Sequence, residues 1–507
     1  MRDTNHLFSQ IRSAIRDETA PFLKTPDGGV ITYGDMLARS AAYANILSAS
    51  GVKPGDRVAV QVEKSAEALM LYLGTLRAGA VFLPLNTAYT PAEIDYFVCD
   101  ARPALLVCDP ARLNALAQIA DKVESHVLTM AADGSGSVST AIDGASREFG
   151  DIGRGPDDLA AILYTSGTTG RSKGAMLSHE NLASNARVLM DYWRFTSDDV
   201  LLHALPIFHT HGLFVASNIT LLAGGSMLFL PKFDLDEMLR LMPQATTMMG
   251  VPTFYSRLLG SDAFTRELAA HMRLFVSGSA PLSAEVHKAF SARTGHAILE
   301  RYGMTETNMN TSNPYDGDRR PGTVGFPLPG VELRIADPES GRVLPEGEVG
   351  VIEVRGPNVF KGYWQMPEKT ASEFRADGFF ITGDMGRIDE RGYVSIVGRA
   401  KDLIITGGFN VYPAEVEAVI DEIEGVAESA VIGVPHADFG EGVVAVVAPH
   451  PGVTLQAEGI VAPLAETLAK FKQPKKVYVL PELPRNTMGK IQKNVLREQY
   501  KDTFGAR

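Results

Sequence analysis

A stretch rich in glycine and hydroxyl side chains follows a short apolar segment about one third of the way along the chain. Residues 161–164 have the composition of a buried strand, and the chain continues as Thr165-Ser166-Gly167-Thr168-Thr169-Gly170-Arg171-Ser172-Lys173-Gly174. Glycines let the backbone come close to a polyphosphate, hydroxyl and amide groups donate to its oxygens, and a lysine adds a charged donor. The Gly-x-x-x-x-Gly-Lys-Ser/Thr spacing of a Walker A loop is absent. The stretch predicts a phosphate-binding loop of another kind, with a flexible surface loop as the alternative.

Several isolated polar residues have simple structural explanations when each is taken alone. Asp384 follows a Thr-Gly pair, which usually marks a turn, and Lys490 stands near the C-terminus, where a lysine is usually solvated. His209 and His211 form a His-x-His pair, but no third residue stands at a spacing suited to a zinc ligand. These residues therefore need a wider context before any of them can be given a role.

The order of the motifs supplies that context, because it resembles the adenylate-forming superfamily of acyl-CoA synthetases, peptide-synthetase adenylation domains and luciferases. The resemblance covers nearly the whole chain. It implies that ATP and a carboxylic acid form an acyl-adenylate and pyrophosphate, and that the acyl group then passes to the thiol of coenzyme A. Besides the loop at 165–174, the matching motifs are Val276-Ser277-Gly278-Ser279-Ala280-Pro281, Glu300-Arg301-Tyr302-Gly303-Met304-Thr305-Glu306, Thr382-Gly383-Asp384, Gly398-Arg399 and Asn486-Thr487-Met488-Gly489-Lys490.

The resemblance implies a role for each motif in the first half-reaction. Asp384 would accept hydrogen bonds from the ribose, Tyr302 would stack on adenine, and Glu306 would bind Mg²⁺, which prefers oxygen ligands. Lys490 would bridge the substrate carboxylate and the α-phosphate and stabilise the charge of the in-line transition state. The catalytic residues implied are Lys490, His209, Thr305 and Glu306. The ATP-binding residues implied are Thr165, Ser166, Gly167, Thr168, Thr169, Gly170, Lys173, Gly278, Ser279, Ala280, Glu300, Arg301, Tyr302, Gly303, Met304, Thr305, Asp384, Arg399 and Lys490.

The second half-reaction requires a change of domain arrangement in this family. Lys401 occupies the hinge position, and Gly407 and Gly408 lie on the loop that would be presented to the pantetheine of coenzyme A. The lysine often found on this loop is Ile405 here. Acetylation of Lys490 by a protein acetyltransferase would remove its charge and stop adenylation.

Further segments resemble malonyl-CoA synthetases, a group within the superfamily. They are Pro206-Ile207-Phe208-His209-Thr210-His211-Gly212, Gly170-Arg171-Ser172-Lys173 and Thr307-Asn308-Met309-Asn310-Thr311-Ser312. The resemblance implies that Arg257 binds the distal carboxylate of a small dicarboxylate, that Ser279 donates a further hydrogen bond, and that His209 positions the reacting carboxylate. A guanidinium can pair a buried carboxylate through two hydrogen bonds, and it would be left unpaired by acetate. Malonate is the expected substrate and methylmalonate a second one.

Three other interpretations compete with a malonate ligase. A short-chain or aryl monocarboxylate CoA ligase would leave Arg257 facing solvent. A non-catalytic nucleotide-binding protein would not need Glu306, Asp384, Arg399 and Lys490 together. An adenylation module would need an adjoining carrier domain, and only residues 491–507 follow Lys490, so free coenzyme A is the expected acceptor.

The elements that must position these motifs are predicted to form an α/β protein. Thr32 and Asp35 cap a helix over 32–47, and short apolar strands then alternate with helices to about residue 310, as in a parallel, helix-flanked sheet. Glycine-bounded strands after residue 345 indicate a small antiparallel, barrel-like part. Helices near 413–422 and 455–470 and strands near 430–434 and 443–447 indicate a small α+β unit. We expect a large N-terminal domain over 1–400 and a small mobile C-terminal domain over 401–507.

Composition excludes other classes of protein. The 507 residues carry a formal net charge of −12, which argues against a nucleic-acid partner. Cys99 and Cys108 provide neither a disulfide framework nor a zinc site, and no apolar run is long enough to span a bilayer. These features predict a cytoplasmic location.

Overall fold

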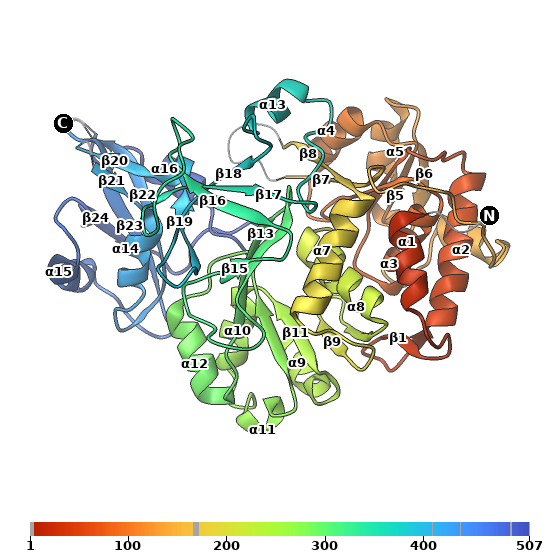
Figure 1. The fold of residues 1–507 in the computed structure, drawn as a ribbon, viewed down its shortest axis with the longest axis horizontal. Coiled ribbons are helices and arrows are strands. Elements are labelled where there is room, and N and C mark those ends of the chain that lie inside the picture. The colour runs from red at the N-terminus through yellow and green to blue at the C-terminus, as the bar shows by residue number, and fades with distance from the viewer. Residues whose placement is uncertain (1–4, 166–171, 408, 437, 487–488, 506–507) are drawn as a thin grey trace.

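Two helix-flanked sheets make up most of the N-terminal part of the computed structural model (Figure 1), which describes residues 5–165, 172–407, 409–436, 438–486 and 489–505. One sheet has the strand order β6-β5-β3-β4-β7-β8, and the other has the order β15-β14-β13-β12-β11-β9-β10-β1-β2. The first comprises β3 Arg57–Gln61, β4 Val81–Pro84, β5 Leu105–Cys108, β6 His126–Thr129, β7 Leu159–Tyr164 and β8 Gly174–Ser178. The second comprises β1 Pro21–Lys24, β2 Val30–Thr32, β9 Val200–His203, β10 Ser226–Phe229, β11 Thr247–Gly250, β12 Leu274–Ser277, β13 Leu299–Met304, β14 Asn308–Ser312 and β15 Phe326–Pro327.

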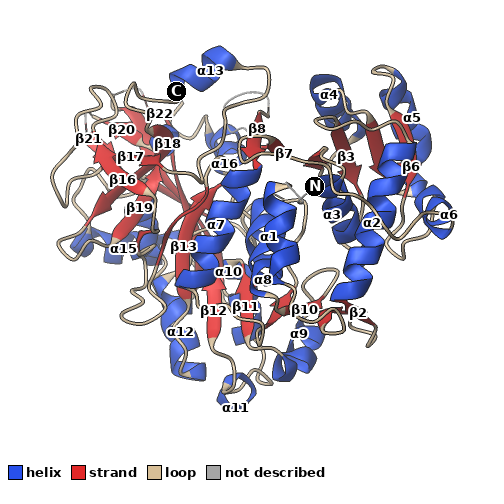
Figure 2. Ribbon diagram, turned by 45° about the vertical axis from the view of Figure 1, so that its right-hand side comes forward, coloured by secondary structure: helices blue, strands red, loops and turns tan. Residues whose placement is uncertain are grey.

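Most neighbouring strands in both sheets are parallel, and β8, β14, β15 and β2 run antiparallel to their neighbours. The interior strands are nearly all apolar because helices cover both faces of the sheets. Helices α1, α3, α7 and α8 lie between the two sheets (Figure 2). The helices of this part are α1 His6–Ala14, α2 Tyr33–Ala49, α3 Ala66–Arg77, α4 Pro91–Ala101, α5 Leu113–Asp121, α6 Ser137–Asp143, α7 His179–Tyr192, α8 Asn218–Ala223, α9 Leu235–Leu241, α10 Pro252–Leu259, α11 Arg266–Ala269 and α12 Ala284–Thr294.

Local sequence explains where several of these helices begin. Thr32 accepts a hydrogen bond from the Asp35 backbone, and the Asp35 carboxylate accepts one from the Thr32 backbone, which completes the capping box predicted from the sequence. Thr90 and Glu93 form the same arrangement ahead of Pro91, whose fixed φ suits the first turn of α4.

Residues after 330 form two smaller sheets. The strands β16 Glu332–Ala336, β17 Gly350–Arg355, β18 Phe380–Ile388 and β19 Val394–Arg399 are antiparallel, and α13 Pro367–Ser372 lies between β17 and β18 along the chain. The C-terminal unit has a sheet of β20 Ile404–Thr406, β21 Phe409–Val411, β22 Val426–His436, β23 Gly440–Pro449 and β24 Lys476–Val479. Its helices are α14 Pro413–Ile420, α15 Ala457–Thr467 and α16 Lys493–Tyr500. This unit lies beside β16–β19 at the left of Figure 1, and α14 packs against β19.

The α/β fold class is confirmed, with a large sheet-containing N-terminal domain and a smaller C-terminal domain. The helix expected over 32–47 is α2, and the strand expected at 430–434 is the centre of the longer β22. The domain limit proposed at residue 400 falls between β19 and β20. Ser166, Gly167, Thr168, Thr169, Gly170 and Gly408 lie outside the described residues. Among the described helices, none combines the length and the apolar character that crossing a bilayer requires.

Candidate active site

The carboxyl ends of β11 and β12 lie beside the first residues of the parallel strand β13, which brings two of the predicted motifs together. Gly250 at the end of β11 pairs with Ser277 of β12, and Ser277 pairs with Glu300 of β13. Ser279 follows β12 with a φ of +73°, a left-handed conformation that is rare outside glycine. Strained residues of this kind concentrate at functional sites, where surrounding contacts hold them in place.

The segment that carries His209 and His211 meets this edge from another strand. It follows β9, and residues His211–Ser217 form a single π-helical turn, a rare geometry that is common at functional sites. His211 Nδ1 lies 3.1 Å from Ser279 Oγ, so the two motifs are in direct contact. Burial lowers the pKa of both histidines, that of His209 to about 3, and nearby cations, including Lys490 for His209, lower it further. Both imidazoles are therefore neutral at neutral pH.

A buried lysine supports this segment from the first sheet. Lys64 Nζ lies 2.9 Å from His203 Nδ1 and donates to the His203 carbonyl oxygen at 2.8 Å. Because Nδ1 accepts, Nε2 of His203 carries the hydrogen and donates to the Gly212 carbonyl oxygen at 2.9 Å. No motif of the sequence marks this pair, since Lys64 and His203 are far apart in the chain.

Two consecutive charged residues on β13 both have buried side chains. Burial raises the pKa of Glu300 to about 8 and lowers that of Arg301 to about 9. Glu300 Oε1 and Arg301 Nε and Nη2 have no hydrogen-bond partner within the described residues. A β-carbon at Gly278 would lie 2.3 Å from Arg301 Cζ, so the missing side chain there makes room for the guanidinium. Such unpaired buried groups are costly, and they indicate a polar ligand.

The remaining part of the 300–306 motif lies against the 382–399 motifs. Tyr302 donates to Asp384 Oδ2 at 2.6 Å, and Arg399 Nε lies 3.1 Å from Asp384 Oδ1. The Asp384 carboxylate and neighbouring Tyr302 raise the pKa of Arg399 against the opposing effect of burial. Glu306 is 6% exposed and accepts a hydrogen bond from the Tyr363 hydroxyl at 3.0 Å. Tyr363 was not predicted, because no motif of the sequence marks it.

Lys490 reaches this cluster from the C-terminal unit. The Asn486 N–H donates to the Lys490 carbonyl oxygen, and the Lys490 N–H donates to the side-chain oxygen Oδ1 of Asn486, each at 2.9 Å. Burial lowers the pKa of Lys490, Arg399 lowers it further, and Asp384 and Glu306 oppose that change. The charge of Lys490 therefore interacts with those of Arg399, Asp384 and Glu306.

Other predicted residues lie at the margins of the cluster or outside it. Thr165 donates from its backbone N–H to the Lys173 carbonyl oxygen at 2.9 Å, which closes the base of the phosphate loop. Arg257 is exposed on α10, and its guanidinium lies 5.5 Å from the ring centroid of Phe233. Lys401 is exposed in the turn Ala400–Asp402, and Gly407 is exposed with a φ of +58°. Four further predicted residues are partly buried: Ala280, Gly303, Met304 and Thr305.

Sequence comparison decides the family of this site. The AMP-binding enzyme family matches residues 12–364, and the AMP-binding enzyme C-terminal domain matches residues 415–490. The chain belongs to the AMP-binding enzyme family. A malonate–CoA ligase of Arabidopsis thaliana is 35% identical over 89% of this chain and 79% of that protein. A feruloyl-CoA synthase of an Amycolatopsis species is 36% identical over 93% of this chain and 94% of that protein.

Solved structures add information on domain arrangement in this AMP-binding family. MatB from Rhodopseudomonas palustris with ATP bound is 64% identical, covers 99% of this chain and 100% of that one, and superposes with a TM-score of 0.97. The apo structure of the same protein gives a TM-score of 0.86 over the same coverage. Because both are structures of one protein, the difference lies in its conformation. This chain superposes more closely on the ATP-bound form than on the apo form.

Proposed function

We propose that the chain is an ATP-dependent malonate–CoA ligase that forms malonyl-AMP and pyrophosphate and then transfers the malonyl group to coenzyme A. The observation that supports malonate as the acid is the buried guanidinium of Arg301, whose Nε and Nη2 have no hydrogen-bond partner among the described residues, together with the Ser279–His211 contact. The reacting carboxylate is met by Lys490, so a second buried cation suits an acid with a second carboxylate. The similarity to a malonate–CoA ligase supports the same acid.

ATP is proposed to bind between the loop at 165–173 and the 300–306 and 382–399 motifs. Asp384 supplies a carboxylate acceptor for the ribose hydroxyls, and Arg399 and Lys173 supply cations for the phosphates. Lys490 donates to the oxygens of the reacting carboxylate and the α-phosphate, where charge builds up in the transition state. Attack of the carboxylate oxygen on the α-phosphorus breaks the bond to pyrophosphate and leaves the mixed anhydride.

Glu306 is the proposed Mg²⁺ ligand, and its surroundings fit that role. The carboxylate is buried, one of its oxygens accepts from Tyr363, and within the described residues no lysine or arginine forms an ion pair with it. Such an oxygen donor suits Mg²⁺, which also takes phosphate oxygens and water. Bound Mg²⁺ would neutralise charge on the β- and γ-phosphates.

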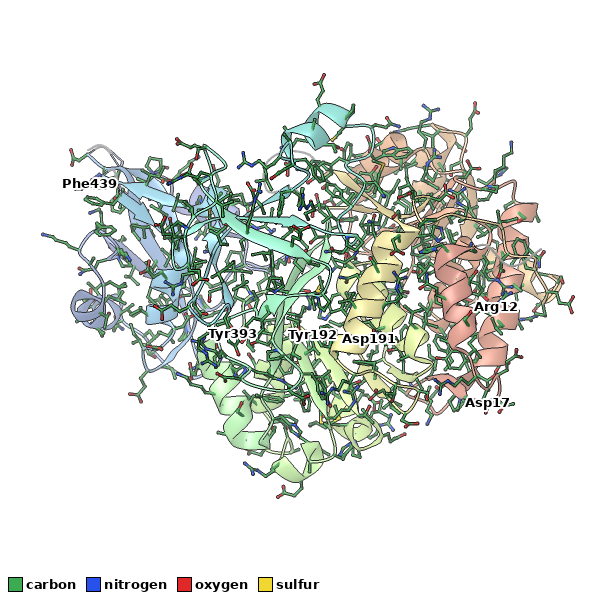
Figure 3. The ribbon with its side chains drawn as sticks, in the orientation of Figure 1. Arg12, Asp17, Asp191, Tyr192, Tyr393 and Phe439 are labelled. Carbon is green, nitrogen blue, oxygen red and sulfur yellow. The ribbon has the colours of Figure 1, made fainter. Side chains whose placement is uncertain are left out.

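Coenzyme A is proposed to meet an apolar and cationic surface of the small domain after this domain rotates about the turn that contains Lys401. Phe409 is 55% exposed and stacks on Phe471, and Lys475 Nζ lies 4.1 Å from the ring centroid of Phe439. Figure 3 shows Phe439 at the outer end of the small domain, away from the centre of the molecule. Gly407 belongs to the same loop, where the lack of a side chain suits a passing pantetheine, and Gly408, outside the described residues, is proposed to act with it.

The decisive experiment is acid-dependent exchange of labelled pyrophosphate into ATP. Malonate should support the fastest exchange, methylmalonate a slower one, and acetate, butyrate and benzoate little. Faster exchange with a monocarboxylate would overturn the malonate assignment. That result would favour the second candidate, a short-chain or aryl acid CoA ligase. The exposed position of Arg257 and the similarity to a feruloyl-CoA synthase support this candidate.

A further inference from the structure

Tyr363 stands between two charged residues that are both assigned to the ATP site. Its hydroxyl donates to Glu306 Oε1 at 3.0 Å, and the ammonium of Lys173 lies 4.7 Å from the centroid of its ring. Lys173 contacts a different carboxylate, Glu373, at 3.8 Å, and Glu373 is itself paired with Lys369 at 2.5 Å. Across the described ranges, Lys173 forms no ion pair with Glu306 although both lie against one ring.

Backbone hydrogen bonds to β8, to α13 and to Glu306 fix the segment that carries Tyr363. Residues 361–364 pair with β8, the strand that leaves the phosphate loop, through the Trp364 N–H to the Gly174 carbonyl oxygen at 2.7 Å and the Lys361 N–H to the Met176 carbonyl oxygen at 2.8 Å. Figure 1 shows α13, which follows this segment, close to β8. The Tyr363 N–H donates to Thr370 Oγ1 on α13 at 2.9 Å. The Phe360 N–H donates to the Glu306 carbonyl oxygen at 2.8 Å, so the same short segment also fixes the backbone of the metal residue.

We propose that Tyr363 is a positioning residue that holds Glu306 ready for Mg²⁺ and keeps the phosphate-binding Lys173 from pairing with it. This inference rests on the proposed function of Glu306. A carboxylate and an ammonium that met in a buried site would neutralise each other, and neither would then be free for metal or phosphate. The ring face attracts the ammonium while the hydroxyl occupies one carboxylate oxygen, which leaves the other oxygen for the metal.

Two substitutions separate these tasks. Tyr363→Phe keeps the ring and removes the hydrogen bond, and Tyr363→Leu removes both. Tyr33→Phe is the matched control, because Tyr33 also donates one buried hydrogen bond, to the Gly225 carbonyl oxygen at 2.6 Å, in the core around α2. Glu306→Gln reports the metal role itself. Titration calorimetry gives the Kd of ATP with and without Mg²⁺, and pyrophosphate exchange gives the Mg²⁺ concentration at half-maximal rate.

Tyr363→Phe should raise the half-maximal Mg²⁺ concentration about 10-fold, the usual effect of losing an orienting partner of a metal ligand, and leave the Kd of metal-free ATP unchanged. Tyr363→Leu should also weaken metal-free ATP, because Lys173 can then pair with Glu306. An unchanged Mg²⁺ requirement in Tyr363→Phe, with a raised one in Glu306→Gln, would overturn the inference alone. Equal weakening of ATP with and without metal in Tyr363→Phe would reduce Tyr363 to a structural role. If Glu306→Gln kept the wild-type Mg²⁺ dependence, the proposed role of Glu306 as a metal ligand would be wrong, and the inference that rests on it would be wrong as well.

Discussion

At the scale of single residues, the site is defined by polar atoms that the protein itself does not satisfy. Arg301 is 4% exposed, and two of its nitrogens have no partner within the described residues. Burying a charge without a counter-charge costs several kcal/mol, so its presence indicates a ligand anion. The sequence placed Arg301 in an ATP motif by resemblance, whereas the geometry puts its guanidinium against Gly278 on the side of His211 and Ser279.

Arg301→Met should test whether Arg301 binds the second carboxylate of the substrate. Loss of one partner of a buried charge pair costs about 2–5 kcal/mol, so kcat/KM for malonate should fall about 30-fold or more. The Kd of ATP should change little, because Asp384 and Lys173 remain. Arg257→Met is the matched comparison in steady-state kinetics of malonyl-AMP formation. A loss of malonate activity in Arg257→Met with none in Arg301→Met would transfer the distal carboxylate to α10.

Local sequence named candidate site residues, but it did not show how their side chains meet. The motifs at 276–281, 300–306, 382–384 and 486–490 each carry a recognisable order of residues, so their members could be named in advance. Tyr363 and the Lys64–His203 pair could not be named, because their partners are brought to them by sheet pairing rather than by spacing. The direction of a side chain such as Arg301 depends on its strand register, which the sequence does not show.

At the scale of elements, the π-helical turn His211–Ser217 positions the histidines, and a single glycine makes it possible. A β-carbon at Gly212 would lie 2.0 Å from the Pro206 carbonyl oxygen, which is a backbone atom that cannot move aside. Ser217 and His203 both contact the Gly212 carbonyl oxygen, so the turn is also held by hydrogen bonds.

Gly212→Ala should therefore lower the stability of the protein and its activity together. Overpacking of this kind costs about 1–3 kcal/mol, and the shift of the turn should break the contact between His211 and Ser279. Thermal unfolding and malonate-dependent exchange measure the two effects. Gly144→Ala is the control, because nothing lies within 4 Å of a β-carbon at that position and its φ is −99°. A wild-type melting temperature and rate in Gly212→Ala would contradict the tight packing of this turn.

The elements themselves followed closely from the sequence where caps and apolar runs were clear. The Thr32–Asp35 capping box fixed the start of α2, and the apolar run Leu105–Cys108 became a fully buried strand. The ends of elements were harder to predict. β22 extends to His436 because its backbone pairs with β23 along its whole length, and pairing partners are not readable from local composition.

At the scale of the whole molecule, a buried acid couples pH to stability near the contact of the two domains. Asp421 caps α14, and burial raises its pKa to about 7, with Glu417 and Glu285 of α12 raising it further and Ser429 lowering it. In the unfolded chain the pKa is near its ordinary value of 3.8. Between these values the folded protein binds a proton that the unfolded chain has released, so the free energy of unfolding falls as pH rises from about 4 to about 7.

Asp421→Asn should remove this dependence. The variant should gain melting temperature relative to the wild type at pH 8 and lose that advantage at pH 4, because an amide carries no charge to bury. The slope for one proton is at most about 1.4 kcal/mol per pH unit. Thermal unfolding at both pH values measures it, with Asp262→Asn on an exposed turn as the control. A parallel pH dependence of the variant and the wild type would show that Asp421 does not titrate in this range.

In the proposed function, the role of Lys490 couples formation of malonyl-AMP to the arrangement of the two domains. The lysine belongs to the C-terminal unit, and its pKa responds to Arg399, Asp384 and Glu306 of the large domain. The chain is also closer to the ATP-bound than to the apo form of MatB. Lys490→Ala should therefore slow malonyl-AMP formation about 10²–10³-fold, the usual effect of losing one transition-state donor.

Transfer of the malonyl group should survive this change, because the proposed rotation of the small domain would move Lys490 away from the acyl-adenylate. Thioester formation from added malonyl-AMP and coenzyme A should stay within a few-fold of the wild-type rate, and homogeneously acetylated Lys490 should behave in the same way. Lys476→Ala, at an exposed lysine of the same domain, controls for general loss of charge. Equal loss of both half-reactions would mean that Lys490 supports the fold of the small domain. Loss of the first alone would tie adenylation to the domain arrangement seen here and leave the turn at Lys401 as the pivot between the two steps.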